Sequence, residues 1–399
     1  LPWLYGISVC AAVYGRELAL FSGCSTAAKG AHMSVYITSS GHFLPGPAIS
    51  NDEIEPLLGQ VHGKPSRLKR RILQSNGIQT RHYAIDSSHN TTISNSAMAA
   101  RASEQCLAQS YLGKRQIKML SAATSQGDIV LPGFGSMVQA ELGLSDIELH
   151  SSHGICSSSM MALKAAFTSI KAGEQPNALV VASELTSRLF KASRYEAAGA
   201  EVDFNAEFLR WMLSDGAGAL LLEQQPRGQC FRIDWIRSFS HADAYPVCMS
   251  VGYPTEGASQ SWQDYPTYAA AEAAGALLIR QDVRLLENIV KLGVDGYLRL
   301  IAEGRVQPDQ IDHVLCHYSS HYFRGKIFDM MQRAGVGIAE EKWYSNLYSR
   351  GNTGCASIFI MLDEFRRTQS YQHGDTILCM VPESGRFNNA YMQLTVLSE

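Results

Sequence analysis

The stretch HSSHGICSSSMMALKAAFTSIKAGEQPNALVVASE, residues 150–184, contains the pattern that decides the fold class. Apolar residues recur at helical spacing over 156–173, and Gly173 predicts the end of that helix. The run NALVVASE, 177–184, is apolar over most of its length, which is typical of a strand buried on both faces of a sheet. A strand-like segment also ends near Gly154, before the helix. Strands and helices alternate in this way along the chain, so we predict a layered α/β fold.

The second half of the chain repeats this order. It contains a predicted strand, an apolar helix and a buried strand at 311–320, 355–367 and 375–383. Cys156 and Glu184 are separated by 28 positions, and so are Cys355 and Glu383. Two ordinary strand–helix units could share this spacing by coincidence, but the equal order at an offset of 199 residues favours duplication. A duplicated α/β fold brings corresponding loops to one face, where two half-sites can meet.

Composition narrows the class of protein. The chain has 399 residues, of which 46% are hydrophobic and 18% charged, as in a globular protein with two domains or one large duplicated domain. The net charge of -3 gives no indication of nucleic-acid binding. The nine cysteines are scattered without a CxxC pair, so we expect no metal site. Several lie inside apolar runs, as small buried side chains do in a reducing cytoplasm.

The first 32 residues are predicted to lie outside the fold. They are rich in apolar side chains, but Arg16 and Glu17 interrupt the run, so we expect no membrane span. No basic segment precedes the run, as it would in a secretory signal. The triplet before Met33 resembles a cloning remnant, and a strand pattern begins at Met33. We therefore interpret residues 1–32 as an extension or a cloning-derived segment.

Cys156 is the first candidate for chemistry. It lies where the predicted strand ends and the predicted helix begins, and a helix N-terminus favours the thiolate over the thiol. The serines that follow it, residues 157–159, are small enough to let a substrate reach the sulfur. The alternative is a buried cysteine that only fills space, the commoner case in a cytoplasmic protein.

Two further residues strengthen the catalytic interpretation. His317 ends a predicted strand, and Asn352 lies in the turn before the second apolar helix. Taken alone, such a histidine is more often structural, and Asn352 could simply cap the helix. Duplication would nevertheless bring both residues toward the Cys156 loop. One Cys, one His and one Asn on converging loops suit acyl-transfer and decarboxylation chemistry.

The sequence resembles the ketoacyl synthase III group of the thiolase superfamily. Seven segments carry the resemblance, in order from Met33 to the C-terminus: SNDEI (50–54), SNGIQTRHYA (75–84), PGFGSMVQAELG (132–143), GICSSS (154–159), LSDGAGALLLE (213–223), IDHVLCH (311–317) and GNTGCAS (351–357). The resemblance implies that Cys156 is the nucleophile and that His317 and Asn352 are the catalytic His and Asn. It also puts Arg81 at the position of a family arginine.

The resemblance implies a duplicated thiolase fold, layered α-β-α-β-α, in a cytoplasmic homodimer. Its halves would be 33–225, with the nucleophile, and 226–399, with His and Asn. An acyl thioester would acylate Cys156, and a malonyl or β-ketoacyl thioester would then condense with the acyl group. The N–H groups of Cys156 and of Ser384 or Gly385 would hold the oxyanion. No metal or redox cofactor is implied, only thioesters of CoA or of the phosphopantetheine on an acyl carrier protein.

Departures from the family pattern bear on the substrate. Tyr318-Ser319-Ser320 replaces the usual Gln-Ala-Asn after the histidine, and His321 is close enough to be the functional histidine instead. The substrate- and carrier-binding candidates are Arg81, Ser319, Ser320, His321 and Arg324. RLKRR (67–71) and Arg324 with Lys326 are candidates for docking an acidic carrier protein, although each could be a solvated helix face.

Three interpretations of the activity remain open at this point. The local sequences resemble specialised members that join two acyl chains, such as those that make dialkylresorcinol precursors, more than the initiator of fatty-acid synthesis. One alternative is an acyltransferase on the same fold that esterifies an alcohol or an amine. The other is a non-catalytic subunit of a heteromeric synthase, although such a subunit would be expected to lose Cys156.

Overall fold

The computed structural model describes residues 33–199, 202–255 and 257–398. The predicted extension, residues 1–32, lies outside the described residues. Within the described part, no helix is both long and apolar enough to cross a membrane.

The first half of the chain forms five strands of a mixed sheet. They are β1 (Tyr36–Phe43), β4 (Met119–Thr124), β5 (Glu148–His153), β6 (Asn177–Glu184) and β7 (Gly216–Glu223). Their order in the sheet is β5-β4-β6-β7-β1. β4 runs parallel to β5 and β6, whereas β7 is antiparallel to both β6 and β1. If the five strands are numbered by their order in the chain, their order across the sheet is therefore third, second, fourth, fifth, first.

The second half forms five strands with the same arrangement. They are β8 (Cys230–Ser240), β11 (His313–Cys316), β12 (Trp343–Tyr344), β13 (Thr376–Val381) and β14 (Asn388–Leu397). Their order is β12-β11-β13-β14-β8, again third, second, fourth, fifth, first. The parallel and antiparallel pairs also correspond. Two residue pairs between β1 and β8 join the two sets. The duplication inferred from spacing is thus present in the topology, while the border at 225/226 stays a prediction.

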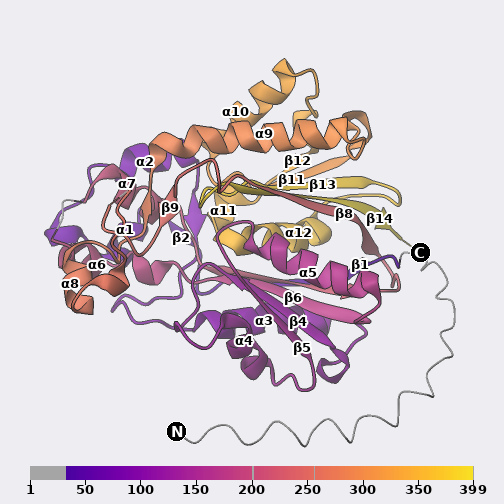
Figure 1. Cartoon of the computed structure of the whole chain (residues 1–399), viewed down its shortest axis with the longest axis horizontal. Helices are drawn as coiled ribbons and strands as arrows, with labels where there is room; N and C mark the ends of the chain where they lie inside the picture. The colour runs from indigo at the N-terminus through magenta and orange to yellow at the C-terminus, as the bar shows by residue number, and fades with distance from the viewer. Residues whose placement is uncertain (1–32, 200–201, 256, 399) are drawn as a thin grey trace, which may run out of the picture. The chain divides into compact units, whose positions relative to one another are not determined.

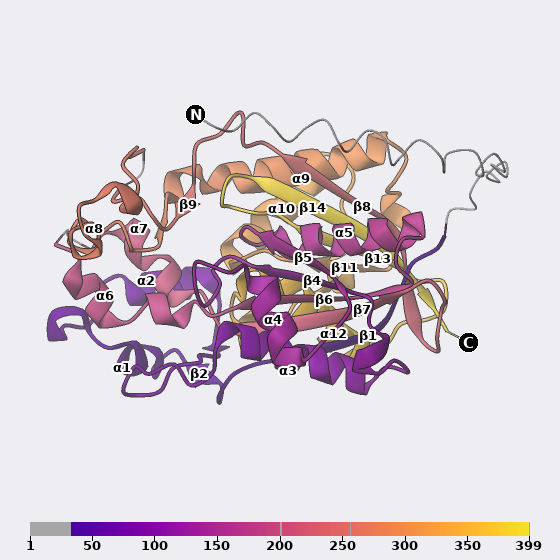
Figure 2. The ribbon, with the colours of Figure 1, turned by 60° about the horizontal axis from the view of Figure 1, so that its bottom comes forward.

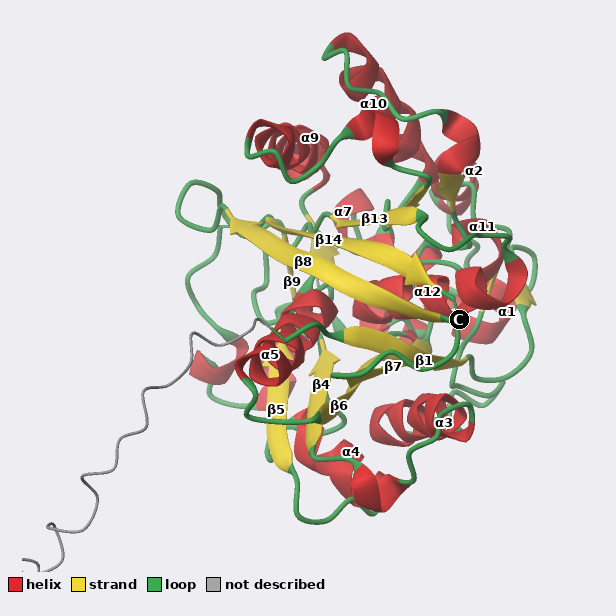
Figure 3. Ribbon diagram, turned by 90° about the vertical axis from the view of Figure 1, so that its right-hand side faces the viewer, coloured by secondary structure: helices red, strands yellow, loops and turns green. Residues whose placement is uncertain are grey.

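Helices cover and separate the two sets of strands in five layers (Figure 3). α3 (Asn95–Ala108) and α4 (Phe134–Leu142) pack on the outer face of the first set. α9 (Leu286–Ala302) and α10 (His321–Arg333) lie outside the second set. α5 (Ser158–Ala172) and α12 (Ser357–Thr368) lie between the sets. The predicted α-β-α-β-α order is confirmed.

Local sequence explains how the central layer forms. α5 ends where predicted, because Gly173 adopts the left-handed conformation with φ 81°. Every residue of β6 is buried, as the continuous apolar run predicts. Gly218 of β7 lets α12 approach closely, since a Cβ there would lie 2.6 Å from the Cβ of Phe359. The core around α5 and α12 is apolar on both sides.

Short elements between the core strands gather on one side of the layers (Figures 1 and 2). They are β2 (Ile49–Ser50), α1 (Ile54–Leu58), α2 (Lys69–Asn76), β3 (Thr80–Arg81), α6 (Ala192–Ala197), α7 (Phe204–Glu207), β9 (Met249–Ser250), α8 (Tyr268–Ala273), β10 (Arg280–Gln281) and α11 (Leu347–Arg350). Residues from this side, among them Leu189, Phe208, Met249 and Ile279, line the cavity described below.

One predicted element is shorter in the structure. The strand predicted at 311–320 ends at Cys316, because the Tyr318 N–H turns back to the Cys316 carbonyl at 3.0 Å. Ser320 then caps α10, and its hydroxyl accepts the N–H of Tyr322. His317 therefore lies in a tight connection, and His321 is the first residue of a helix.

Candidate active site

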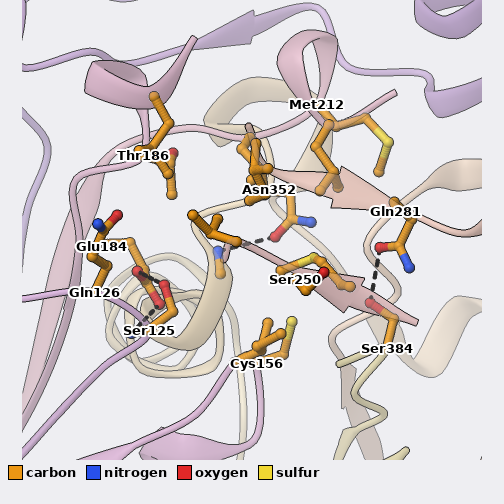
Figure 4. Close-up of a pocket in the computed structure, with 18 of the residues that line it drawn as sticks. Ser125, Gln126, Cys156, Glu184, Thr186, Met212, Ser250, Gln281, Asn352 and Ser384 are labelled. Carbon is orange, nitrogen blue, oxygen red and sulfur yellow. Dashed lines mark hydrogen bonds between the residues drawn. The ribbon is translucent and has the colours of Figure 1, made fainter. Parts of the chain in front are cut away.

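A cavity of about 570 Å³ lies at the ends of the central strands, and we call it the main cavity. Cys156, Asn352 and Ser384 all line it, although they come from distant parts of the chain (Figure 4). Its remaining wall is mostly apolar, including Leu189, Phe208, Leu209, Met212, Leu213 and Ile279. A volume of this size with few polar groups is typical of a small-molecule site.

Cys156 lies between β5 and α5, two residues before the first helical residue, as predicted. Only 6% of its surface is exposed, although its side chain borders the main cavity. Ser157, Ser158 and Ser159 are also buried. The sulfur is therefore accessible only from the cavity.

The surroundings of the sulfur oppose the predicted stabilisation of the thiolate. Burial raises the pKa of the Cys156 thiol well above its ordinary value, and the carboxyls of Glu383 and Glu184 raise it further. These effects act against the helix N-terminus, which favours the anion.

Asn352 is held by both halves of the chain. Its N–H donates to the Met212 carbonyl at 3.1 Å, and its own carbonyl accepts the N–H of Ser214 at 2.8 Å. Its side-chain oxygen accepts the N–H of Gly354 at 3.0 Å. This bond closes a local turn and does not cap the helix, because the N-cap residue of α12 (Ser357–Thr368) is Ala356. The amide nitrogen lies on the other side of the group, toward the cavity (Figure 4).

His317 is not among the residues that line the main cavity. It lines a narrow hollow beside it, and Ser319 borders both spaces. His317 is only 3% exposed, and its Nε2 has no hydrogen-bond partner among the described residues. Burial lowers the pKa of His317 to about 4, so the imidazole is neutral at neutral pH.

His321, the alternative histidine, lies in a different setting. It is exposed at the start of α10, and its Nδ1 lies 2.7 Å from the hydroxyl of Tyr348. It borders neither the main cavity nor the hollow beside it. Of the two histidines, His317 is therefore the one next to the cavity.

The loop that carries Ser384 approaches Cys156 closely. A Cβ on Gly385 would lie 2.5 Å from Cδ1 of Ile155, so a side chain there would push the two loops apart. The Ser384 hydroxyl donates to the side-chain carbonyl of Gln281 at 3.2 Å, and Gln281 in turn donates to the Cys248 carbonyl at 3.0 Å. The side chain of Ser384 is thus anchored by Gln281, and the residue lines the main cavity.

Arg81 has a structural position instead of the predicted substrate contact. Its side chain is fully buried and donates to Asn51 Oδ1 at 3.0 Å and to the Trp211 carbonyl at 3.3 Å. It does not line the main cavity. Its guanidinium ties the residue after β2 to the segment before β7.

Three of the candidate carrier-binding cations have acidic partners. Arg324 pairs with Glu340, and Lys326 lies 2.9 Å from Glu287. Lys69 of the RLKRR segment lies 3.5 Å from Glu55. The charges of these three side chains are therefore already paired within the fold.

A second pocket, of about 400 Å³, adjoins the main cavity, and we call it the side pocket. Arg71, Ser320 and Phe323 line it, together with Phe208 and Leu286, which also border the main cavity. Two of the candidates from the sequence, Ser320 and Arg71 of the RLKRR segment, therefore line the same pocket.

Sequence reasoning gave no role to Glu184, Glu383 and Gln281. Glu184 borders the main cavity and accepts the Ser125 hydroxyl at 2.5 Å. Glu383 accepts the Ser157 hydroxyl at 2.5 Å, next to Cys156. The signal for both glutamates was their equal position at the ends of the two repeated windows. No sequence signal pointed to Gln281. The described residues contain no group of three or more His, Cys, Asp or Glu side chains that could hold a metal ion.

Family models match both halves of the chain. The N-terminal model, 3-oxoacyl-[acyl-carrier-protein] synthase III, matches residues 152–239, and the C-terminal model of the same family matches residues 301–386. β-ketoacyl-[acyl-carrier-protein] synthase III from Bordetella petrii is 24% identical over 342 residues, which cover 86% of this chain and 92% of that protein. The enzyme of the same name from Streptococcus uberis is 24% identical over 331 residues, covering 82% of this chain and 88% of that protein.

Solved structures share the fold. The tetronic acid condensing enzyme AbyA1 matches with a TM-score of 0.73 and 19% identity, covering 90% of this chain and 99% of that chain. A variant of OleA from Xanthomonas campestris, with bound lauric acid and lauroyl-CoA, matches with a TM-score of 0.71 and 18% identity, covering 92% of this chain and all of that one. The synthase III of Aquifex aeolicus matches with a TM-score of 0.67 and 20% identity, covering 90% and 99%.

The chain is therefore a condensing enzyme with the thiolase fold. The matched segments and the relatives make it a ketoacyl synthase III-like enzyme, an acyltransferase that forms carbon–carbon bonds.

Proposed function

We propose that Cys156 carries the acyl group, that His317 and Asn352 act in condensation, and that the N–H groups of Cys156 and Ser384 hold the oxyanion. The observation that supports this assignment is the common position of Cys156, Asn352 and Ser384 on one apolar cavity. A neutral His317 with an unpartnered Nε2 beside that cavity suits a hydrogen-bond donor better than a cation.

In the first step, the Cys156 sulfur attacks the carbonyl carbon of an acyl thioester. The carbon–sulfur bond of the substrate breaks, and the thiol proton ends on the departing thiol. Two backbone N–H donors would stabilise the negative oxygen of the intermediate, and the loss of one such donor typically costs about 10²–10³ in rate.

In the second step, a malonyl or β-ketoacyl thioester occupies the site. Loss of CO₂ from a malonyl group, or transfer of an α-proton of a β-ketoacyl group to solvent, leaves an enolate. Hydrogen bonds from His317 and Asn352 to its oxygen would stabilise it. The carbanion then attacks the acyl carbon on Cys156. The products are the free cysteine and a longer β-ketoacyl thioester. Every role here belongs to side chains or backbone groups of this chain, with no metal or redox cofactor.

The preferred acyl group is proposed to be of medium or long chain length. The main cavity is lined by apolar side chains well beyond Cys156, including Leu185, Leu277 and Leu286. Burying a chain of methylenes against such a wall is favourable by about 0.8 kcal/mol per CH₂. We propose a β-ketoacyl extender as well, which would make the product a precursor of the dialkylresorcinol type.

The thioester donor is proposed to be CoA or an acyl carrier protein, whose phosphopantetheine arm reaches the site through the side pocket. This pocket adjoins the main cavity at Phe208 and Leu286, and Arg71 lines the side pocket. A cation at the opening would attract the phosphate groups of either donor. The same interpretation gives Ser319 and Ser320 contacts to the arm.

The enzyme is proposed to act as a homodimer in the cytoplasm. Strand β5 is an edge strand whose residues are largely exposed, and Ile129, Val130 and Leu131 expose 49%, 75% and 82% of their surfaces beside it. An unpaired edge next to an exposed apolar group is typical of a surface that a second copy covers.

Intact-mass measurement after incubation with a panel of acyl thioesters tests the proposed function. We expect a single acyl adduct, largest for medium and long chains. A simple acyltransferase would also form this adduct but would pass it to an alcohol or amine, whereas a non-catalytic subunit would form none. Adding an extender thioester should release the adduct as a β-ketoacyl product. Release only by an alcohol or amine would contradict condensation.

A further inference from the structure

Several polar side chains that line the main cavity are already held by the protein itself. The Ser125 hydroxyl donates to the Glu184 carboxyl at 2.5 Å, and the Thr186 hydroxyl donates to the Asp215 carboxyl at 3.3 Å. Ser250 differs from these two residues. It lines the same cavity, but its hydroxyl makes no hydrogen bond to any of the described residues. A hydroxyl in this mostly apolar wall is therefore free to donate to a ligand.

The position of Ser250 is fixed by the backbone around it. Ser250 is the last residue of β9, which pairs with β10. The residue before it, Met249, donates its N–H to the carbonyl of Gly385 at 3.3 Å. Gly385 follows Ser384, whose N–H is proposed to hold the acyl oxygen. In Figure 4, Ser250 lies between Asn352 and Ser384 on the lining of the cavity. The free hydroxyl is thus held next to the proposed oxyanion loop.

The two extenders considered above differ in the number of oxygens that share the negative charge. After CO₂ leaves a malonyl thioester, the enolate has only the oxygen of the thioester carbonyl. In a β-ketoacyl thioester, the C–H bond between the two carbonyls breaks, the proton passes to solvent, and both carbonyl oxygens share the electron pair. His317 and Asn352 are proposed to donate to the thioester oxygen. The keto oxygen therefore needs a donor of its own, because an unpaired polar group is costly in an apolar cavity.

The geometry of the condensation places this keto oxygen near Ser250. The carbon that attacks the acyl group is bonded directly to the keto carbon, so the keto oxygen lies close to the acyl oxygen during the attack. We propose that Ser250 donates its hydroxyl to the keto oxygen of a β-ketoacyl extender and thereby selects this extender over a malonyl unit. This inference rests on the proposed function, in particular on the β-ketoacyl extender. It gives the cavity a donor that only one of the two extenders uses.

The test is a single-turnover assay on enzyme pre-acylated with a long-chain acyl-CoA, with either malonyl-CoA or a β-ketoacyl-CoA as extender. In Ser250→Ala, the rate with the β-ketoacyl-CoA should fall by about 10- to 100-fold, as expected for a lost hydrogen bond to a charged oxygen. The rate with malonyl-CoA should change little. Ser250→Thr keeps a hydroxyl and should restore most of the lost rate. Ser319→Ala is the matched control, because Ser319 is proposed to contact the arm that both extenders share, and it should affect both rates alike.

A binding measurement gives a second readout that needs no turnover. Calorimetry with a β-ketoacyl pantetheine amide, which cannot transfer its acyl group, should show weaker binding to Ser250→Ala than to the wild type, whereas the saturated acyl amide should bind both equally. Equal losses with the two extenders, or unchanged rates and affinities, would overturn the proposal. A wild-type enzyme that does not use the β-ketoacyl-CoA would refute the proposed extender, and the calorimetry would still decide whether Ser250 recognises the keto group.

Discussion

At the residue scale, Cys156 is subject to opposing effects. The start of α5 favours its anion, while burial and two carboxyls favour the neutral thiol. Its reactivity therefore depends on the electrostatic surroundings as much as on its place in the chain. The neighbouring Cys355 occupies the equivalent place in the second half, but it is fully buried and does not line the main cavity. The two cysteines therefore differ in their access to the main cavity.

Cys156→Ala should abolish the acyl adduct and leave the fold intact, because it removes the sulfur and only a small buried volume. Intact-mass spectrometry with a long-chain acyl-CoA measures the adduct, and circular dichroism checks the fold. Cys355→Ala is the matched control and should keep the adduct. Acylation that persists in Cys156→Ala would show that another residue is the nucleophile.

His317→Ala and Asn352→Ala should retain acylation but lose condensation by about 10²–10⁴-fold, since their proposed task is limited to the enolate. Single-turnover assays on pre-acylated enzyme separate the two steps. His321→Ala should be milder, because His321 is exposed and bonded to Tyr348 outside the cavity. If His321→Ala were the more damaging change, the functional histidine would have been assigned to the wrong position.

At the scale of elements, the central helices determine where the site forms. α5 and α12 start at the same end of the layers, and each begins next to a strand end of the opposite half. This arrangement brings Cys156, from before α5, into one cavity with Asn352, from before α12. The packing of α12 on β7 is therefore part of the architecture of the site.

Gly218→Ala should destabilise the protein by about 1–3 kcal/mol, the usual cost of overpacking a core, because its methyl group would meet Phe359 of α12 at 2.6 Å. Urea unfolding measures the change in the free energy of unfolding. Gly325→Ala in α10 is the control, since a Cβ there meets nothing within 4 Å. In a helix this control should be neutral or stabilising by about 0.5–1 kcal/mol. Equal effects at both glycines would contradict the close-packing argument.

At the scale of the whole molecule, the described chain leaves one sheet edge and an apolar loop uncovered. β5 ends the strand order, and Val130 next to it also borders the main cavity. A second copy on this face would therefore change both the exposed apolar surface and the surroundings of the site.

Light scattering at micromolar concentration should give the mass of a homodimer. Leu131→Asp should shift the protein toward monomer, because it places a charge in the apolar surface proposed to be covered. Tyr111→Asp is the control, as Tyr111 is also highly exposed, at 76%, but lies on a different segment. A monomeric wild-type protein would contradict the dimer.

The pairing of an acyl thioester with a β-ketoacyl thioester should give a two-chain product, since the apolar wall of the main cavity extends far beyond Cys156. Mass spectrometry of the product distinguishes this outcome from simple elongation. If only acetyl and malonyl substrates gave a product, the enzyme would be an ordinary initiator and the two-chain interpretation would be wrong.

The sequence by itself determined the layered fold, its duplication and the position of the Cys156 loop, because helical spacing, buried apolar runs and repeated spacing are local patterns. It also indicated Asn352 through its place before the second central helix. Only the tertiary structure decided the electrostatic state of Cys156, the buried role of Arg81 and the separation of His317 from the main cavity. Each of these depends on which distant side chains meet after folding. Glu184 and Glu383 are the clearest case, because each accepts an N–H from the opposite half, of Cys355 and Ser157 respectively. The spacing of the two glutamates was visible in the chain, but these partners were not.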